Sequence, residues 1–278
     1  MSSVISTTPG ARWQRRLQAV PPWAWLALQA GALWTHWRWA AARLSDGSDD
    51  PLGLAALALL VWAIVRLAPQ LRGQPRPAWL AWALLLSVVS TASLPIAPPL
   101  VGALLAALAL VCGLAAFMPA GRAMAPLAGL AVLALPVLSS LQFYAGYPLR
   151  VATAQLSSWA LQLAGIAAGR SGSAMEVEGR LVIVDAPCSG VQMVWMAYFC
   201  ACAVAVLSDL HDRRFVRRLP WIGFIVLAGN VLRNSVLVLA EARGGVSEAM
   251  HQAVGLVVLA AVCAAVVAVV RGGRDARA

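Results

Sequence analysis

The stretch "AVGLVVLAAVCAAVVAVV", residues 253–270, contains no charged residue and has close to the length of a transmembrane helix, which indicates the fold class. A helix needs about 20 consecutive apolar residues to cross the hydrocarbon layer of a bilayer. Similar blocks recur along the 278-residue chain, which is 61% hydrophobic and 12% charged, whereas soluble domains carry about 25% charged residues. The sequence therefore predicts an all-α polytopic membrane protein.

Apolar blocks upstream of this stretch also qualify as transmembrane helices. We treat residues 1–278 as a single integral membrane domain and expect its spans at about 20–37, 51–69, 78–95, 99–118, 125–147, 188–207, 219–240 and 250–270. No small-residue cleavage pattern follows the first block, so we expect that block to be a retained signal anchor.

The 21 basic residues are all arginine, and their distribution predicts the orientation. With a cytoplasmic N-terminus, 14 of the 21 arginines fall on predicted inner segments and 8 of the 11 acids on predicted outer segments. This positive-inside bias places both termini in the cytoplasm. Because topology accounts for the net charge of +10, we expect a lipid bilayer around the protein and no nucleic-acid partner.

The long loop at residues 148–187 is expected outside and contains two patterned segments. The segment "MEVEGRLVIVD", residues 175–185, alternates around Gly179 and suggests a short β-hairpin. The preceding segment predicts an interfacial helix that lies on the membrane or against the bundle. Its apolar stripe consists of Leu149, Ala152, Leu156, Trp159, Leu163 and Ile166.

Three chemically distinctive side chains lie near predicted spans in the last third of the chain. Cys188 opens the sixth span within "DAPCSGVQM", Arg233 lies about two helical turns inside the seventh, and His251 opens the eighth. Because consecutive spans alternate in direction, all three residues belong to the outer leaflet. Placing an ionisable group in a membrane span costs free energy, so we treat each of these three residues as a candidate functional residue.

A thiol, a guanidinium and an imidazole in one pocket would suit acyl transfer. The thiolate is the reactive form of cysteine, and a neighbouring cation lowers the pKa of a thiol. His251 would take the thiol proton and return it to the leaving amine, while Arg233 would stabilise the oxyanion. Gly190 permits a sharp entry into the span, whose free first-turn N–H groups favour a thiolate at Cys188.

Each of these residues also has a purely structural interpretation. A lone cysteine at a helix start is ordinarily inert packing, and a lone interfacial histidine ordinarily faces solvent. Arg233 needs a partner at its depth, which Glu241 or backbone carbonyls could supply. Asn230 and Asn234 form either the hydrogen-bonded shell of Arg233 or helix-packing contacts. His36, at the outer end of the first span, is expected at the membrane interface.

The ordered motifs resemble the exosortase/archaeosortase family over about residues 130–270. They are Cys188-Ser189-Gly190 at a span entrance, Asn230-Val231-Leu232-Arg233 in the next span and His251 at the start of the one after. The resemblance implies a membrane cysteine protease or transpeptidase. Its nucleophile would be Cys188, its oxyanion or thiolate stabiliser Arg233 and its general acid/base His251, with Ser189, Gly190, Asn230 and Asn234 in support.

The resemblance also implies a substrate class and a location. Members are thought to process exported, membrane-anchored proteins with a C-terminal sorting tail. The tail has a short motif (Pro-Glu-Pro in the bacterial branch), a transmembrane helix and a basic cluster. Cleavage through a thioester would occur at the outer face of the bacterial cytoplasmic membrane. No cofactor or metal is expected, since the five cysteines show no zinc-ligand spacing.

The main alternative is a non-enzymatic protein, either a transporter or an assembly factor for surface polysaccharide. Arg233 would then bind an anionic group of the cargo. Transporters often contain two similar halves, and the sequence shows no such symmetry. A serine intramembrane protease would need a GxSx nucleophile with a histidine deep in a span, and a metalloprotease would need HExxH; neither arrangement occurs.

Overall fold

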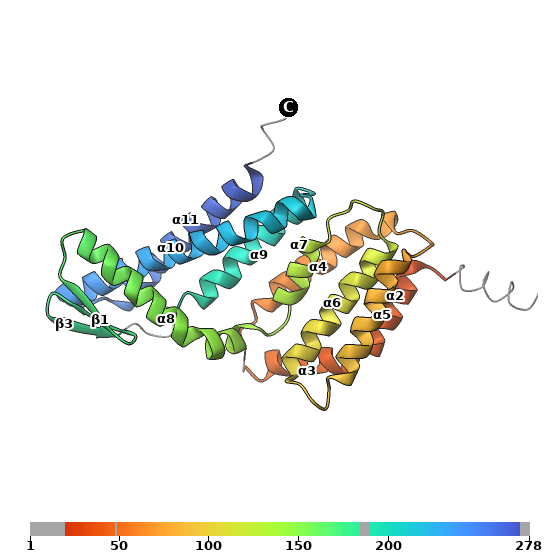
Figure 1. Cartoon of the computed structure of the whole chain (residues 1–278), viewed down its shortest axis with the longest axis horizontal. Coiled ribbons are helices and arrows are strands. Elements are labelled where there is room, and N and C mark those ends of the chain that lie inside the picture. Colours follow the sequence, from red (N-terminus) through yellow and green to blue (C-terminus); the bar gives the residue numbers. More distant parts are fainter. Residues whose placement is uncertain (1–19, 48, 184–188, 273–278) are drawn as a thin grey trace, which may run out of the picture.

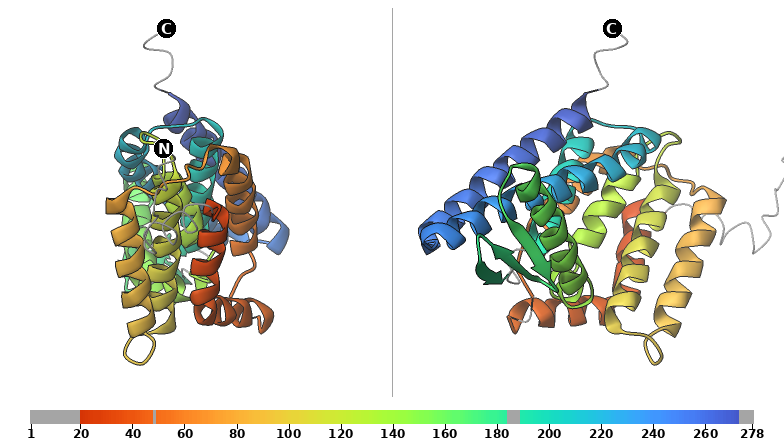
Figure 2. Two further views of the ribbon diagram at one scale, coloured as in Figure 1. Left: turned by 90° about the vertical axis from the view of Figure 1, so that its right-hand side faces the viewer. Right: turned by 60° about the vertical axis from the view of Figure 1, so that its left-hand side comes forward.

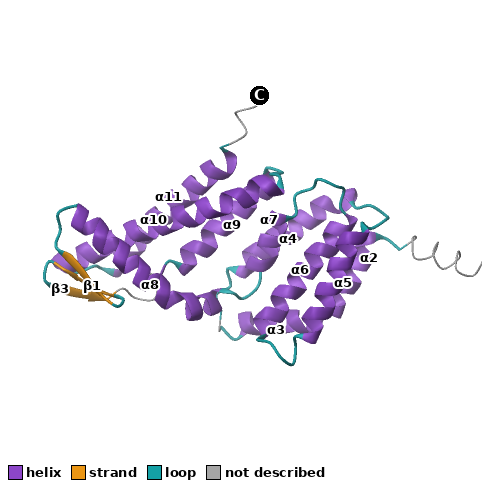
Figure 3. Ribbon diagram, viewed as in Figure 1, coloured by secondary structure: helices purple, strands orange, loops and turns teal. Residues whose placement is uncertain are grey.

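The computed structural model describes residues 20–47, 49–183 and 189–272 as helices joined by loops, with one small sheet (Figures 1 and 3). The N-terminal half consists of α2 (Pro22–Ala32), α3 (Trp34–Ser45), α4 (Gly53–Leu67), the 3₁₀ turn η1 (Ala68–Gln70), α5 (Pro77–Ala92) and α6 (Pro99–Phe117). The C-terminal half consists of α7 (Ala125–Leu133), α8 (Leu138–Leu163), β1 (Ala168–Ser171), β2 (Ala174–Val177), β3 (Arg180–Ile183), α9 (Val191–Leu207), α10 (Asp212–Gly244) and α11 (Glu248–Arg271).

These helices make the chain a multi-pass membrane protein, with fewer long spans than the eight predicted. Within the described ranges, four helices are long and apolar enough to cross a bilayer, namely Gly53–Gln70, α6, α10 and α11. A fifth is obtained if the bent pair α7–α8 is one span. The apolar helices α5 and α9 are shorter, at 16 and 17 residues. Eight spans therefore remain a prediction.

The predicted fifth span, residues 125–147, is not one straight helix. α7 ends at Leu133, and α8 begins at Leu138 at an angle of 92° to it. Pro136 lies in the break, where it cannot donate the N–H that a continuous helix needs and disfavours helical backbone in the residue before it. The segment expected as a separate loop helix is the second half of α8.

Part of the apolar stripe predicted for this segment is exposed, while Leu149 and Ile166 at its two ends pack against apolar cores and a polar face contacts α10. Trp159 and Leu163 are 53% and 91% exposed, whereas Thr153 and Ser157 are buried and bond to α10. A membrane favours this arrangement, because lipid accepts apolar side chains and polar groups must find partners within the protein. α8 is thus held to α10 through its polar face.

The predicted first span, residues 20–37, breaks at Leu33, after which α3 turns away from the direction of α2 (Figure 2). His36 on α3 is buried, and its Nε2 lies 2.8 Å from Oγ of Ser90 on α5. Ser90 Oγ donates in turn to the carbonyl of Gly102 on α6, at 2.9 Å. His36 is thus packed between helices, where this hydrogen-bond chain compensates its burial, and its depth in the membrane stays a prediction.

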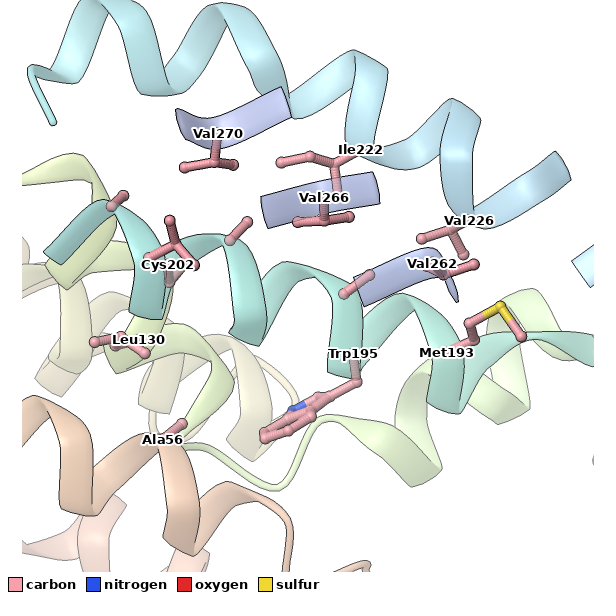
Figure 4. Close-up of a cluster of buried hydrophobic side chains, with 14 of the residues drawn as sticks. Ala56, Leu130, Met193, Trp195, Cys202, Ile222, Val226, Val262, Val266 and Val270 are labelled. Carbon is pink, nitrogen blue, oxygen red and sulfur yellow. The ribbon is translucent and has the colours of Figure 1, made fainter. Parts of the chain in front are cut away.

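The main apolar core surrounds α9, which packs against α7 on one side and α10 and α11 on the other (Figure 4). α11 contributes Val258, Val262, Val266 and Val270, all buried and spaced four residues apart. Residues four apart lie on one face of a helix, so this valine stripe is the packing face of α11. Cys202 of α9 is buried in the same core as a small apolar residue.

The loop between α8 and α9 forms a three-stranded antiparallel sheet in the order β1-β2-β3. β2 and β3 pair around Glu178 and Gly179, where the sequence suggested a hairpin, and β1 adds a strand that was not predicted. Both turn residues have positive φ angles, 51° and 78°, as in a type I′ turn. A hydrogen-bonded ion pair with Arg243 of α10 (2.8 Å) lowers the pKa of the Glu178 carboxyl and ties the sheet to α10.

The close approach of α10 to α11 depends on Gly229. A Cβ atom at this position would lie only 2.4 Å from Cγ2 of Val262. We expect Gly229→Ala to lower the free energy of unfolding by about 1–3 kcal/mol through overpacking. Adding Val262→Ala to the same chain should restore part of that loss, because it removes the clashing methyl group. Thermal unfolding of the purified protein in detergent measures both effects.

Gly244→Ala is the matched control, because a Cβ at Gly244 would meet nothing within 4 Å. Its unfolding midpoint should equal that of the wild type. If Gly229→Ala also leaves the midpoint unchanged, or if Val262→Ala restores nothing, the packing argument for this helix pair is incorrect.

Candidate active site

Two of the three side chains predicted to react meet between α10 and α11. Nη2 of Arg233 lies 3.0 Å from Nε2 of His251. Arg233 projects from α10, and His251 lies in the first turn of α11. Both side chains are half-buried. The sequence placed the two residues in one leaflet, and the packing of the two helices brings them into contact.

This contact identifies the form of the histidine. A guanidinium can only donate hydrogen bonds, so Nε2 of His251 accepts, and the neutral imidazole carries its proton on Nδ1. The pair is therefore a cation beside a neutral base. A protonated imidazole would have no acceptor to offer Arg233 and would repel its charge.

Local features of α11 position both members of the pair. Oγ of Ser247 accepts the N–H of Met250 at 3.2 Å and caps the helix directly before the turn that carries His251. Gly255 lies one turn after His251 and borders the guanidinium, since a Cβ there would make an ordinary contact at 3.4 Å from Nε of Arg233. The start of α11 thus supplies the acceptor and also a residue beside the guanidinium.

His251 lines a pocket of about 360 Å³ between the sheet, α10 and the start of α11. Three consecutive residues of β3 form one wall of this pocket. Glu241, considered from the sequence as a structural partner of Arg233, also lines it. The Glu241 carboxylate accepts the N–H of Val246 at 2.7 Å and thereby closes the turn that follows α10.

The predicted nucleophile, Cys188, lies outside the described residues, which resume at Ser189. Ser189 is buried, and its Oγ donates to Oε1 of Gln142 on α8 at 2.9 Å. Gly190 precedes α9 with a φ of 80°, and a Cβ there would lie 2.8 Å from Cγ of Asn230. This position needs glycine both for its left-handed backbone and for the closeness of α10.

The two predicted supporting asparagines connect α10 to α8. Nδ2 of Asn230 donates to Oγ1 of Thr153 at 3.0 Å, and Nδ2 of Asn234 donates to Oγ of Ser157 at 2.9 Å. Both pairs are spaced four residues apart, so they form a buried polar ladder between the helices. Of the two interpretations left open by the sequence, these bonds favour helix packing.

Sequence reasoning missed Thr153 and Ser157, the α8 side of this polar ladder. It assigned polar faces of the segment to other residues and expected the helix to lie on the membrane or against the bundle. The sequence did contain one sign of this contact. The two α8 hydroxyls are four residues apart, and so are the two α10 amides. Two helices can form such a ladder of hydrogen bonds only if their polar residues have the same spacing.

The other end of α10 is rich in arginine and lies far along the helix from the pocket. There Arg218 donates to the carbonyl of Val270 at the end of α11. Asp212 accepts the backbone N–H groups of Met124 and Ala125, at 2.8 and 2.7 Å, and so joins the start of α10 to the start of α7. One end of the helix group is therefore basic, and the opposite end holds the pocket.

Comparison with known proteins assigns the chain to a family. The family model described as transmembrane exosortase (Exosortase_EpsH) matches residues 39–268, a stretch that runs from α3 into α11 and includes Arg233 and His251. No curated protein and no solved structure matches the chain. Because the family match covers most of the sequence and agrees with the resemblance of its motifs, the chain belongs to the transmembrane exosortase family.

Proposed function

We propose that the protein is a cysteine protease or transpeptidase that cleaves the C-terminal sorting tails of exported, membrane-anchored proteins. Cys188 is the nucleophile, His251 the general acid/base and Arg233 the stabiliser of thiolate and oxyanion. The observation that carries the proposal is the 3.0 Å contact between Arg233 and His251 beside a pocket that His251 lines. Membership of the exosortase family supports it independently of that geometry.

The proposed reaction forms and breaks one thioester. His251 takes the proton of the Cys188 thiol, and the thiolate attacks the scissile carbonyl carbon. The C–N bond breaks, His251 returns the proton to the leaving amine, and the acyl group remains on sulfur. Water or an amine then attacks the thioester, and the thiol is restored.

The resting geometry implies a change of partner during this reaction. Nε2 is the accepting atom of His251, and Arg233 occupies it. Nε2 has one lone pair, so Arg233 must release it before Nε2 takes the thiol proton, and the protonated Nε2 can no longer accept a hydrogen bond. The guanidinium is then free to donate to the oxyanion, where a charge-assisted bond is strong. On this proposal Arg233 holds the neutral base before the reaction and stabilises negative charge during it.

We infer that the pocket lies at the outer face of the bacterial cytoplasmic membrane, with both termini in the cytoplasm. The arginine-rich start of α10 lies opposite the pocket end of the helix, as the positive-inside bias requires. The small sheet indicates that this end of the helix group lies outside the hydrocarbon, because strand edges with unsatisfied backbone groups are too costly inside it.

Cys188→Ala tests the nucleophile. We expect Cys188→Ala to lower cleavage of a tail-bearing substrate in the same cell to background. Cys188→Ser should show at most a trace of cleavage, since a hydroxyl is far less readily ionised than a thiol. An immunoblot of the substrate measures the size change. Cys112→Ala, on α6, is the matched control and should cleave normally. Continued processing by Cys188→Ala would favour the transporter or assembly-factor alternative.

Arg233→Lys separates charge from geometry. Lysine keeps the positive charge but loses the planar fork that can serve an imidazole and an oxyanion in turn. We expect cleavage to fall about 10²–10³-fold, the scale of one lost oxyanion donor, with the same amount of protein in the membrane. Full activity of this variant would reduce Arg233 to a structural role.

Substitutions at Gly255 test the contact without changing either partner. Alanine adds a Cβ at 3.4 Å from Nε of Arg233, which the guanidinium can tolerate, whereas the further methyl groups of valine displace it from His251. We expect near-normal cleavage for Gly255→Ala and a loss of about tenfold or more for Gly255→Val, because small misplacements are costly in catalysis. Equal cleavage rates for the two variants would contradict a role for the contact.

A further inference from the structure

The small sheet has two outer edges, and α8 covers one of them. On β1, the carbonyl of Ala168 accepts hydrogen bonds from Oγ of Ser158 at 3.2 Å and Nε2 of Gln162 at 2.6 Å. The strand order β1-β2-β3 makes β3 the other edge. Within the part of the chain that the structure describes, no residue bonds to the outward side of β3. The sheet therefore offers one open edge.

The hydrogen-bond pattern determines which backbone groups point out of that edge. The N–H of Glu178 donates to the carbonyl of Ala167 at 3.0 Å, so Glu178 faces β1. Backbone groups of successive residues in a strand point to opposite sides, so those of Val177 face β3. The same result follows from the two-residue turn, whose flanking residues Val177 and Arg180 form the hydrogen-bonded pair of a hairpin.

Alternation along β3 then assigns its remaining residues. Val182, opposite Met175, directs its backbone groups toward β2. Leu181 and Ile183 direct their N–H and C=O groups out of the open edge. Their side chains are also accessible, with exposures of 70% and 64%. The edge thus presents two donors and two acceptors in alternation, together with two exposed apolar side chains.

This open edge borders the proposed catalytic pair. Leu181, Val182 and Ile183 form a wall of the pocket that His251 lines, and α10 forms the facing wall. A chain laid along β3 would therefore run through the space beside the imidazole. The pocket, at about 360 Å³, is large enough for a few side chains of such a segment.

We propose that the open edge of β3 binds an extended segment of the substrate polypeptide by strand addition and leads it to His251 and Arg233. Alternating donors and acceptors on a strand edge are matched along their length by another extended backbone. Main-chain bonding supplies affinity that tolerates different sequences, while the pocket between β3 and α10 selects side chains. This inference rests on the proposed function, because it takes a polypeptide to be the substrate.

Cysteine cross-linking tests the binding mode directly. Leu181→Cys is placed in the Cys188→Ala chain, which should leave the tail uncut, and single cysteines are moved one residue at a time through the tail ahead of its transmembrane helix. Oxidation should give a disulfide at the tail position opposite Leu181 and little at the two positions beside it, because neighbouring residues of a paired strand point to opposite faces. Arg170→Cys, on the edge that α8 covers, is the matched control and should give none.

A second measurement uses the active chain. Leu181→Pro removes one outward N–H and leaves the bonds between β2 and β3 intact, whereas Leu181→Ala keeps the N–H and removes only the side chain. We expect Leu181→Pro to lower kcat/KM about tenfold through a higher KM, the effect of one lost hydrogen bond. Leu181→Ala shortens one pocket wall but keeps the N–H, so it should raise KM less than Leu181→Pro does. Unfolding midpoints show whether each variant is folded. If Leu181→Pro does not fold, the cross-linking experiment tests the proposal.

The outcomes separate this inference from the function on which it rests. A wild-type chain that does not cleave the tail contradicts the proposed function. If the wild type cleaves, strand addition is overturned by cross-links spread evenly over neighbouring positions or by none, or by a folded Leu181→Pro variant with normal kinetics. One preferred cross-link position with little at either neighbour, together with a raised KM, supports it.

Discussion

An arginine among apolar helices is costly unless its guanidinium finds hydrogen-bond partners, and this constraint organises the C-terminal half of the protein. Arg233 meets Nε2 of His251 at 3.0 Å, and Gly255 lies beside the guanidinium. The contact exists only because α10 and α11 pack closely, which Gly229 and the valine stripe of α11 permit. Apolar packing thus sets the geometry of the polar pair.

The same demand for partners explains the elements around that pair. α8 is held to α10 by the ladder of Asn230 with Thr153 and Asn234 with Ser157, while Trp159 and Leu163 of its apolar stripe are exposed. The sheet that follows α8 has its β1 edge covered by two side chains of that helix. Among the described residues its β3 edge has no bonding partner along the pocket, and we assign that edge to the substrate.

Particular elements show how far sequence reasoning reaches. Hydropathy predicted a helical membrane protein, and the direction of the spans placed Arg233 and His251 in one leaflet, because both properties depend on composition and order along the chain. The 92° break between α7 and α8 was missed although Pro136 marks it, since proline signals a break but no angle. The burial of His36 was missed because its partner, Ser90, lies 54 residues away.

The sequence by itself determined the membrane class, the family and the residue types available for chemistry, because these follow from hydropathy and from motifs of neighbouring residues. It also identified Gly190, where the chain enters α9 with a positive φ angle. Only the tertiary structure decided that Arg233 donates to His251, that α8 bonds through its polar face and that β3 is the open edge. Each of these depends on distances between segments far apart in the chain, which local sequence does not encode.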